Sequence, residues 1–215
     1  MDITGTEGIV VSGSPGNHKN KLHFLINGLD RAKQLKNKVS GSEDVTWIIY
    51  NDKKNGFSQK DINKYSAQAQ KLGINVREFS EVNDIINYVN EKSGKKDREK
   101  DQISIFYYIG HALPGSLNVG YSGTGQSLDP KNFDSSSFKS GAYINLVGGC
   151  RTAVPPKILL IPIGRSVIQK FANNLDKQSV IQGSNVRVTY PGGVVSDSKL
   201  VQKNNGSIVT INGTR

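Results

Sequence analysis

Two residues of this 215-residue chain combine a reactive side chain with a position just after an apolar segment: His111 and Cys150. Cys150 is the only cysteine, and it follows the run AYINLV and two glycines, whereas His111 follows the run ISIFYYI and one glycine. A free thiol has a pKa of ~8.5, so a neighbouring imidazole is needed to raise its thiolate fraction near neutral pH. Together, the two side chains would make a nucleophile and its general base.

The apolar segments at residues 103–109 and 142–147 are predicted to be strands covered on both faces, because neither shows the alternation of a half-exposed strand. In open parallel α/β sheets, catalytic groups collect at the carboxyl ends of the strands. If these two strands are adjacent and parallel, His111 and Cys150 emerge at the same edge although they are 39 positions apart.

The residues next to this pair are suited to support acyl transfer. Gly148 and Gly149 would let the backbone turn sharply before the thiol and would leave open space for a substrate backbone. The N–H groups beside Cys150 and His111 are candidates for holding the oxyanion of a tetrahedral intermediate.

The positioning elements follow from hydrophobic periodicity. Strands are expected at residues 44–51, 74–80, 103–109, 142–147, 179–183, 185–190 and 207–213, of which the last two could pair as a hairpin. Amphipathic helices are expected at residues 20–38, 58–72 with a Ser58 cap, 82–89 and 167–175. This alternation predicts an α/β fold, a three-layer sandwich around a largely parallel sheet, with an additional N-terminal helix.

The domain organisation is predicted to be simple. Residues 1–43 are expected to form a lead-in, with a short apolar strand candidate in GIVVSGSPG and a basic amphipathic helix, and residues 44–215 a single domain. The charged run 91–101 is expected to be an exposed loop. It and the glycine- and serine-rich linker 113–141 are candidate processing sites, because proteolysis concentrates in long exposed segments.

Composition restricts the function classes. The net charge is +10, but the cations are dispersed and the chain is only 7% aromatic, so we expect a solvated basic surface and no specific nucleic-acid site. A single cysteine excludes an intrachain disulfide and a multi-cysteine metal site, and no metal or cofactor is expected. No apolar run approaches the ~20 residues of a membrane span, and the first residues lack a signal-peptide pattern. If the protein is exported, this chain does not carry the address.

The motifs IFYYIGHA and INLVGGCRTA resemble those of the caspase-like (clan CD) cysteine peptidases, and the likeness covers roughly residues 44–190. The resemblance implies a caspase-like sheet with Cys150 as nucleophile and His111 as general base. It also implies an oxyanion hole made by the backbone N–H groups of Cys150 and Ala112. The activity implied is that of an endopeptidase that hydrolyses a protein or peptide substrate through a thioester intermediate, without a cofactor.

Two positions depart from the family pattern. Ala112 stands where the family usually has glycine, and Gly148 stands where true caspases carry a glutamine that helps to bind aspartate. Aspartate specificity is therefore not implied. Asp129, Asp134 and Asp197 are candidates for a pocket that takes a basic residue, although turns commonly carry such residues, and the substrate-binding residues are not otherwise identified.

A second resemblance concerns residues 12–36, which are similar to the junction after the conserved core of Rhs-repeat proteins, whose variable C-terminal domains are toxins. It implies an effector domain delivered as part of a longer protein. Three hypotheses follow: a cysteine endopeptidase, a catalytically inactive caspase-like binding or adaptor domain, and a basic toxin domain that acts on nucleic acid. The first explains the placement of Cys150 and His111, whereas the third explains only the net charge.

Overall fold

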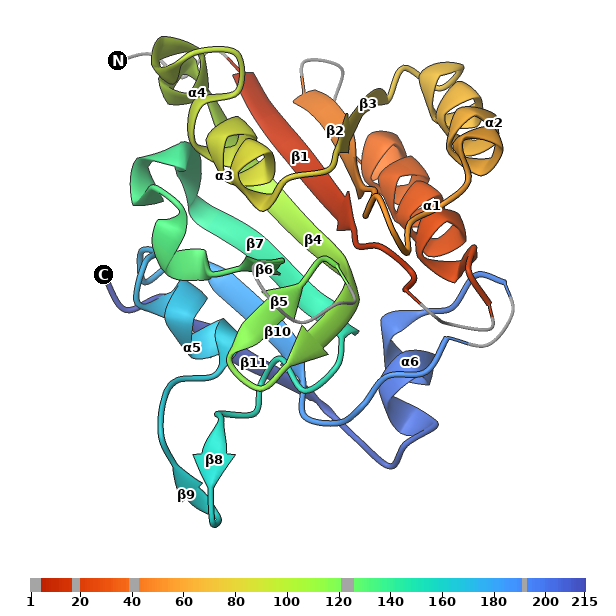
Figure 1. The fold of residues 1–215 in the computed structure, drawn as a ribbon. Coiled ribbons are helices and arrows are strands. Elements are labelled where there is room, and N and C mark those ends of the chain that lie inside the picture. The colour runs from red at the N-terminus through yellow and green to blue at the C-terminus, as the bar shows by residue number, and fades with distance from the viewer. Residues whose placement is uncertain (1–4, 17–19, 39–42, 121–125, 191–192) are drawn as a thin grey trace.

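A mostly parallel sheet, with nine strands among the described residues, lies at the centre of the fold (Figure 1). The computed structural model describes residues 5–16, 20–38, 43–120, 126–190 and 193–215. The main path of the sheet has the order β11-β10-β7-β4-β1-β2-β3, and within it only the β10–β11 pair is antiparallel.

The strands on this path are β1 (Gly5–Ser12), β2 (Glu43–Tyr50), β3 (Asn75–Phe79), β4 (Asp101–Leu113), β7 (Phe138–Gly149), β10 (Val180–Ser184) and β11 (Ile208–Asn212). Two short strands, β5 (Ser116–Asn118) and β6 (Ser127–Leu128), extend the sheet from the end of β4. A separate hairpin consists of β8 (Lys157–Ile158) and β9 (Ile161–Pro162).

Helices cover both faces of the sheet. The helices are α1 (His23–Lys38), α2 (Gln59–Gln70), α3 (Val82–Glu91), α4 (Lys95–Lys100), α5 (Val167–Ala172) and α6 (Asp197–Gln202), with 3-10 turns η1 (Pro130–Asn132) and η2 (Ser135–Ser137). Apolar side chains of α1, α2 and α6 share one core cluster, and those of α3 and α5 share the other. The prediction of an α/β three-layer sandwich is therefore confirmed.

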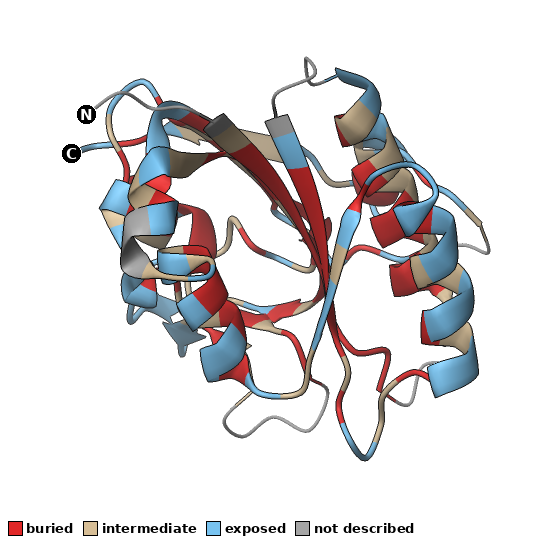
Figure 2. Ribbon diagram, turned by 90° about the horizontal axis from the view of Figure 1, so that it is seen from above, coloured by how far each residue is buried: buried red, intermediate tan, exposed pale blue. Residues whose placement is uncertain are grey.

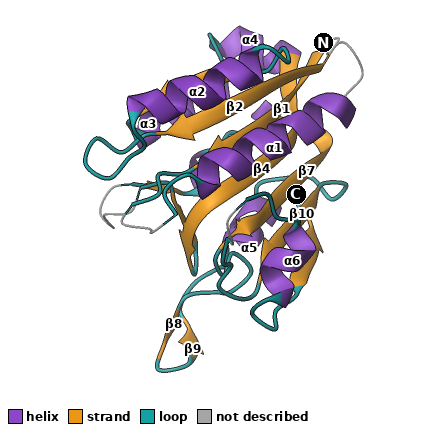
Figure 3. Cartoon of the chain, turned by 90° about the vertical axis from the view of Figure 1, so that its right-hand side faces the viewer, coloured by secondary structure: helices purple, strands orange, loops and turns teal. Residues whose placement is uncertain are grey.

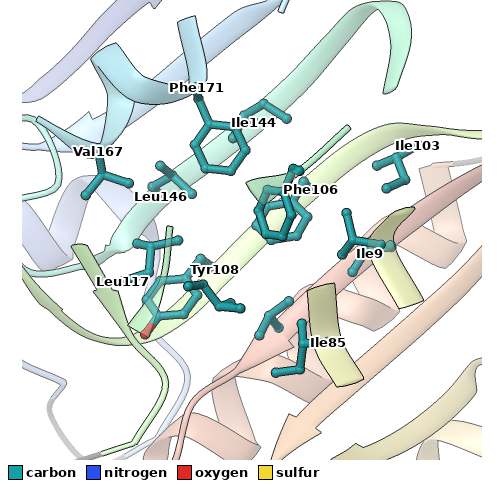
Figure 4. Packing of buried hydrophobic residues seen from close by; sticks show 14 of the residues in the cluster. Ile9, Ile85, Ile103, Phe106, Tyr108, Leu117, Ile144, Leu146, Val167 and Phe171 are labelled. Carbon is teal, nitrogen blue, oxygen red and sulfur yellow. The ribbon is translucent and has the colours of Figure 1, made fainter. Parts of the chain in front are cut away.

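Burial follows this layering. Seen from above, buried residues are concentrated on the central strands and on the inner sides of the helices (Figure 2). Along β1, Ile9 and Val11 contribute to the cluster with α3 and α5, and Val10 to the cluster with α1. Figure 4 shows the first cluster, where Phe106 of β4 lies among side chains from β7, α3 and α5. Strands covered on both faces explain the continuous apolar runs.

The local signals of the helices are also found in the structure. Ser58 is the N-cap of α2, and its hydroxyl accepts a hydrogen bond from the Asp61 N–H at 3.2 Å. Ser166 and Gln169 form a capping box at the start of α5. Among the described residues, no helix has both the length and the apolar character needed to cross a bilayer.

The N-terminal segment has a larger role than that of a lead-in. β1 lies between β2 and β4 and pairs with both in parallel, and α1 packs on the same sheet. A boundary at residue 43 therefore does not separate two structural units. The sequence did not reveal this, because the central place of β1 depends on pairing with strands that follow later in the chain.

Two segments differ from their predicted form. Residues 185–190 are not a strand, and β11 pairs with β10 instead, so the predicted hairpin is wrong. The charged run 91–101 contains α4, and Arg98 within it is buried, so the prediction of an exposed loop is wrong for that part. The linker 113–141 contains β5, β6, η1 and η2, while its residues 121–125 lie outside the described chain.

Arg98 is buried because it neutralises a buried carboxylate. Its Nη1 lies 2.7 Å from Oε2 of Glu7, which is fully buried on β1. The Tyr88 hydroxyl donates to Oε1 of Glu7 at 2.7 Å, and Arg98 donates to the Tyr88 carbonyl at 2.9 Å. Burial, reinforced by the negative charge of Glu7, raises the pKa of Tyr88 to about 12. This network connects α3 and α4 to the amino-terminal end of β1.

Replacing Arg98 by methionine should lower the free energy of unfolding by about 3–5 kcal/mol, because it leaves the buried Glu7 charge without its partner. Urea denaturation measures this loss. Lys53→Met is the control, because Lys53 and Glu81 form an exposed pair and its loss should cost less than about 1 kcal/mol. Equal effects of the two substitutions would contradict the role given to Arg98.

Candidate active site

The parallel pairing of β4 and β7 brings His111 and Cys150 to one cavity. Gly110 lies opposite Gly149 in the register, and the next residue of each chain segment is His111 and Cys150, respectively. Both residues line a cavity of about 470 Å³. β4 continues through His111, which pairs with Asn118 of β5, so the histidine lies within a strand and not in a loop after it.

A main-chain carbonyl contacts the His111 ring. Its Nε2 lies 3.2 Å from the Pro15 carbonyl oxygen. A carbonyl can only accept a hydrogen bond, so in the neutral ring Nε2 carries the proton and Nδ1 carries the lone pair. The turn that contains Pro15 is tied to neighbouring segments by bonds from the Gly13 N–H to the Ile109 carbonyl (2.8 Å) and from the Ser14 N–H to the Val119 carbonyl (2.5 Å).

Aromatic residues pack around the imidazole. Phe24 of α1 meets the His111 ring edge-on, with centroids 5.1 Å apart, and also contacts the ring of Tyr190. The Ser12 hydroxyl donates to the Phe24 carbonyl at 3.0 Å, which anchors the start of α1 on the end of β1. On the strand itself, the Tyr108 hydroxyl lies 2.5 Å from the His111 carbonyl oxygen. These contacts hold the imidazole in place at the cavity wall.

Cys150 begins a tight turn after β7. Arg151 adopts a left-handed conformation with φ of 52°, which is uncommon for a residue with a side chain and is often found at functional sites. The Arg151 N–H donates to the Val186 carbonyl at 2.8 Å, and the Ala153 N–H donates to the Ser184 carbonyl at 2.9 Å. The turn is therefore fixed against the end of β10 and the residues that follow it.

The glycines before Cys150 serve close packing and not open space, so that part of the sequence interpretation is wrong. A Cβ on Gly148 would lie 2.6 Å from the Tyr108 carbonyl oxygen and 2.7 Å from the Tyr190 hydroxyl. A Cβ on Gly149 would lie 2.9 Å from Cγ2 of Thr152. Protein atoms fill the volume where side chains would otherwise be, and the Tyr190 hydroxyl donates to the Gly148 carbonyl at 2.7 Å.

The electrostatics of the thiol reflect two opposing effects. Cys150 is half-buried, and burial raises the pKa of its thiol above the ordinary value. The positive charges of Arg187 and Arg151 act in the opposite direction. In this arrangement Sγ lies 3.6 Å from the Val188 carbonyl oxygen, to which the thiol donates a weak hydrogen bond. Both arginines line the cavity, and no carboxylate is among its described lining residues.

The remaining predicted site residues divide into two groups. Ala112 and Cys150, whose N–H groups are the predicted oxyanion hole, both line the cavity, and this role stays a prediction. Asp129, Asp134 and Asp197 do not line it, so they do not form a pocket there for a basic residue.

Two of these aspartates have structural partners elsewhere. Asp197 pairs with Arg31 at 2.5 Å, and Asp129 with Lys170 at 3.2 Å. Within the described part of the chain, no group of three or more His, Cys, Asp or Glu residues could hold a metal ion.

Sequence reasoning missed several residues at this site, among them Phe24, Arg187 and Tyr190 in the cavity wall and Pro15 against the His111 ring. Pro15 follows the carboxyl end of β1, which neighbours β4, so recognising β1 as a central strand would have placed it beside His111. Arg187 and Tyr190 belong to the segment that was read as a hairpin strand. No local pattern distinguishes them from ordinary strand residues.

Comparisons with protein-family models, curated proteins and solved structures find no match to this chain. The fold and the site therefore define the protein only at the level of class. It is an α/β sandwich in which neighbouring parallel strands bring a thiol and an imidazole to one cavity.

The rate of Cys150 alkylation by iodoacetamide should rise with pH and reach half its maximum above the ~8.5 of a free thiol, because burial raises the pKa. Arg187→Ala should move this midpoint to still higher pH, because the guanidinium charge favours the thiolate. Alkylation followed by mass spectrometry across pH 6–11 measures both profiles. A midpoint below that of a free thiol would contradict this account.

Proposed function

We propose that this protein is a cysteine endopeptidase in which Cys150 is the nucleophile and His111 the general base. The observation that carries the proposal is that the parallel register of β4 and β7 brings both residues to the wall of one cavity. Their types and order along the chain also resemble the caspase-like peptidases. Further support comes from the bond between Nε2 of His111 and the Pro15 carbonyl, because it favours the tautomer with the proton on Nε2 and the lone pair on Nδ1.

The reaction proceeds by acyl transfer. His111 Nδ1 takes the thiol proton, and Sγ of Cys150 attacks the carbonyl carbon of the scissile peptide bond. The N–H groups of Cys150 and Ala112 stabilise the oxyanion. When the C–N bond breaks, His111 returns the proton to the leaving amine and a thioester remains. His111 then deprotonates a water molecule, which hydrolyses the thioester, releases the acid product and restores the thiol.

The resting arrangement is that of a protonated nucleophile. The thiol faces the Val188 carbonyl, and its pKa is raised by burial. Transfer of its proton to His111 therefore requires the Cys150 side chain to turn from Val188 toward the imidazole. Catalytic hydrogen bonds commonly tighten only when substrate is bound. We propose that an occupied cavity favours this rotamer.

The charge of the cavity indicates the substrate class. Arg151 and Arg187 line it, and its described lining contains no Asp or Glu. Because exposed guanidinium groups pair with carboxylates through two parallel hydrogen bonds, we propose that the preferred peptides carry an acidic side chain near the scissile bond. This replaces the idea of a pocket for a basic residue.

Cys150→Ala should abolish proteolysis, because the alanine cannot form the thioester. Mass spectrometry of new peptide N-termini, in a cell lysate treated with each protein, should find cleavage sites only with the wild type. His111→Ala should reduce kcat by about 10²–10⁴-fold, because it removes the general base. Unchanged thermal melting of both variants is the control for folding.

The rival hypotheses give different results in the same assay. A catalytically inactive adaptor would yield identical termini for wild type and Cys150→Ala, and an activity-based thiol probe would not label Cys150. A nucleic-acid-acting toxin would leave the lysate proteins intact but degrade or bind RNA or DNA with a steep salt dependence. Either result would overturn the peptidase proposal.

Arg187→Ala should lower kcat/KM for peptides with an acidic residue near the cut by ~10-fold or more, a loss typical of a charge-assisted pair. Peptides with the matching amide should be affected less. Arg77→Ala on β3 is the matched control, because Arg77 is exposed at the far edge of the sheet and does not line the cavity. An equal loss for acidic and amide peptides would contradict charge recognition by Arg187.

A further inference from the structure

The β8–β9 hairpin extends away from the body of the protein, as Figures 1 and 3 both show. Lys157 pairs with Pro162 and Ile158 with Ile161, and the Ile163 N–H donates to the Pro156 carbonyl at 2.9 Å to close the base. The hairpin lies in the chain between the Cys150 turn and α5, and it has no role in the proposed chemistry.

The tip of this hairpin presents aliphatic side chains to solvent. Leu159 is 90% exposed and Leu160 86%, and the neighbouring isoleucines Ile158, Ile161 and Ile163 are each more than half exposed. Elsewhere the fold buries most of its large apolar side chains in two clusters. An exposed group of large aliphatic residues in one projecting element is typical of a contact surface.

The backbone of the tip strengthens this interpretation. Leu159 and Leu160 have φ values of 47° and 71°, a left-handed conformation that two-residue hairpin turns normally satisfy with Asn and Gly. Leucine is disfavoured there, and it gains nothing from packing because both side chains are exposed. Leucines at this tip therefore cost folding stability, which is consistent with a contact outside the chain.

The hairpin segment, residues 154–165, carries only positive charges. Lys157 and Arg165 flank its tip and are exposed, and the chain has no acidic residue between Asp134 and Asp176. Aliphatic residues at the tip, with Lys157 and Arg165 beside them, complement a lipid bilayer with anionic headgroups. A stable dimer would need roughly 800 Å² per partner and a matching concave surface, whereas a bilayer accepts a small convex tip.

We propose that the β8–β9 hairpin docks this protein on anionic membranes, with Leu159 and Leu160 inserted at the boundary between headgroups and acyl chains. Lys157 and Arg165 pair with the lipid phosphates and anionic headgroups. Gly115 packs against Pro156 and Arg165 at the base of the hairpin, and its neighbour Pro114 lines the cavity, so docking would hold the cavity near the membrane surface. This inference does not depend on the peptidase proposal.

Flotation with lipid vesicles tests it, using phosphatidylcholine alone and phosphatidylcholine with phosphatidylserine. The wild type should float with the anionic vesicles, and less so as salt increases. The double variant Leu159→Asn, Leu160→Gly should lose more than ~10-fold in partition coefficient, because it removes the apolar side chains. It introduces the residues that this turn prefers, so unfolding would not be the cause, and thermal melting checks that.

Two further variants make the test specific. Lys157→Ser, Arg165→Ser should weaken binding to the anionic vesicles only. Leu72→Asn, at an exposed leucine just after α2, should leave binding unchanged. Absence of wild-type binding to anionic vesicles, or equal binding by the Asn-Gly variant, would overturn the proposal. A third outcome would also overturn it: light scattering finds a wild-type dimer, the double variant Leu159→Asn, Leu160→Gly is a monomer, and vesicle binding is the same for both. The hairpin would then contact a second copy of the chain.

Discussion

The parallel pairing of β4 with β7 is the constraint on which the candidate site depends. Side chains of a strand have a fixed position relative to the neighbouring strand, so placing Gly110 opposite Gly149 also brings His111 and Cys150 to the same edge. A shift of one residue in this register would send side chains to the opposite face. The register is in turn held by apolar residues of both strands, which are packed on two faces.

The close packing at this edge of the sheet requires glycine at several positions. The buried Tyr108 contacts both a glycine and the main chain of His111. A Cβ on Gly110 would lie 2.7 Å from the Tyr108 hydroxyl. This hydroxyl also lies within hydrogen-bond distance of the His111 and Asn118 carbonyls. Burial raises the pKa of Tyr108 well above its ordinary value, so the phenol remains a neutral donor. The strand geometry and the position of the histidine are therefore maintained by the same contacts.

The basic residues of the chain act differently according to where the fold places them. Arg98 is buried near the amino-terminal ends of β1 and β4, where it neutralises Glu7 and stabilises the sheet. Arg151 and Arg187 lie at the opposite ends of the strands, where they line the cavity and favour the thiolate of Cys150. The net charge of +10 does not show which basic residues stabilise the fold and which line the cavity. The distinction arises from burial, which decides whether a charge must be paired or can face a ligand.

The sequence by itself determined the fold class, the identity of β4 and β7 as fully covered strands, and the position of Cys150 just after β7; it placed His111 near the end of β4, although that strand continues to Leu113. It could do so because strand burial and helix caps such as Ser58 depend on residues close together in the chain. Only the tertiary structure decided that β1 is central, that Pro15 orients His111, and that residues 187–190 line the cavity. These features depend on contacts between distant segments, and local periodicity does not specify which segments will meet.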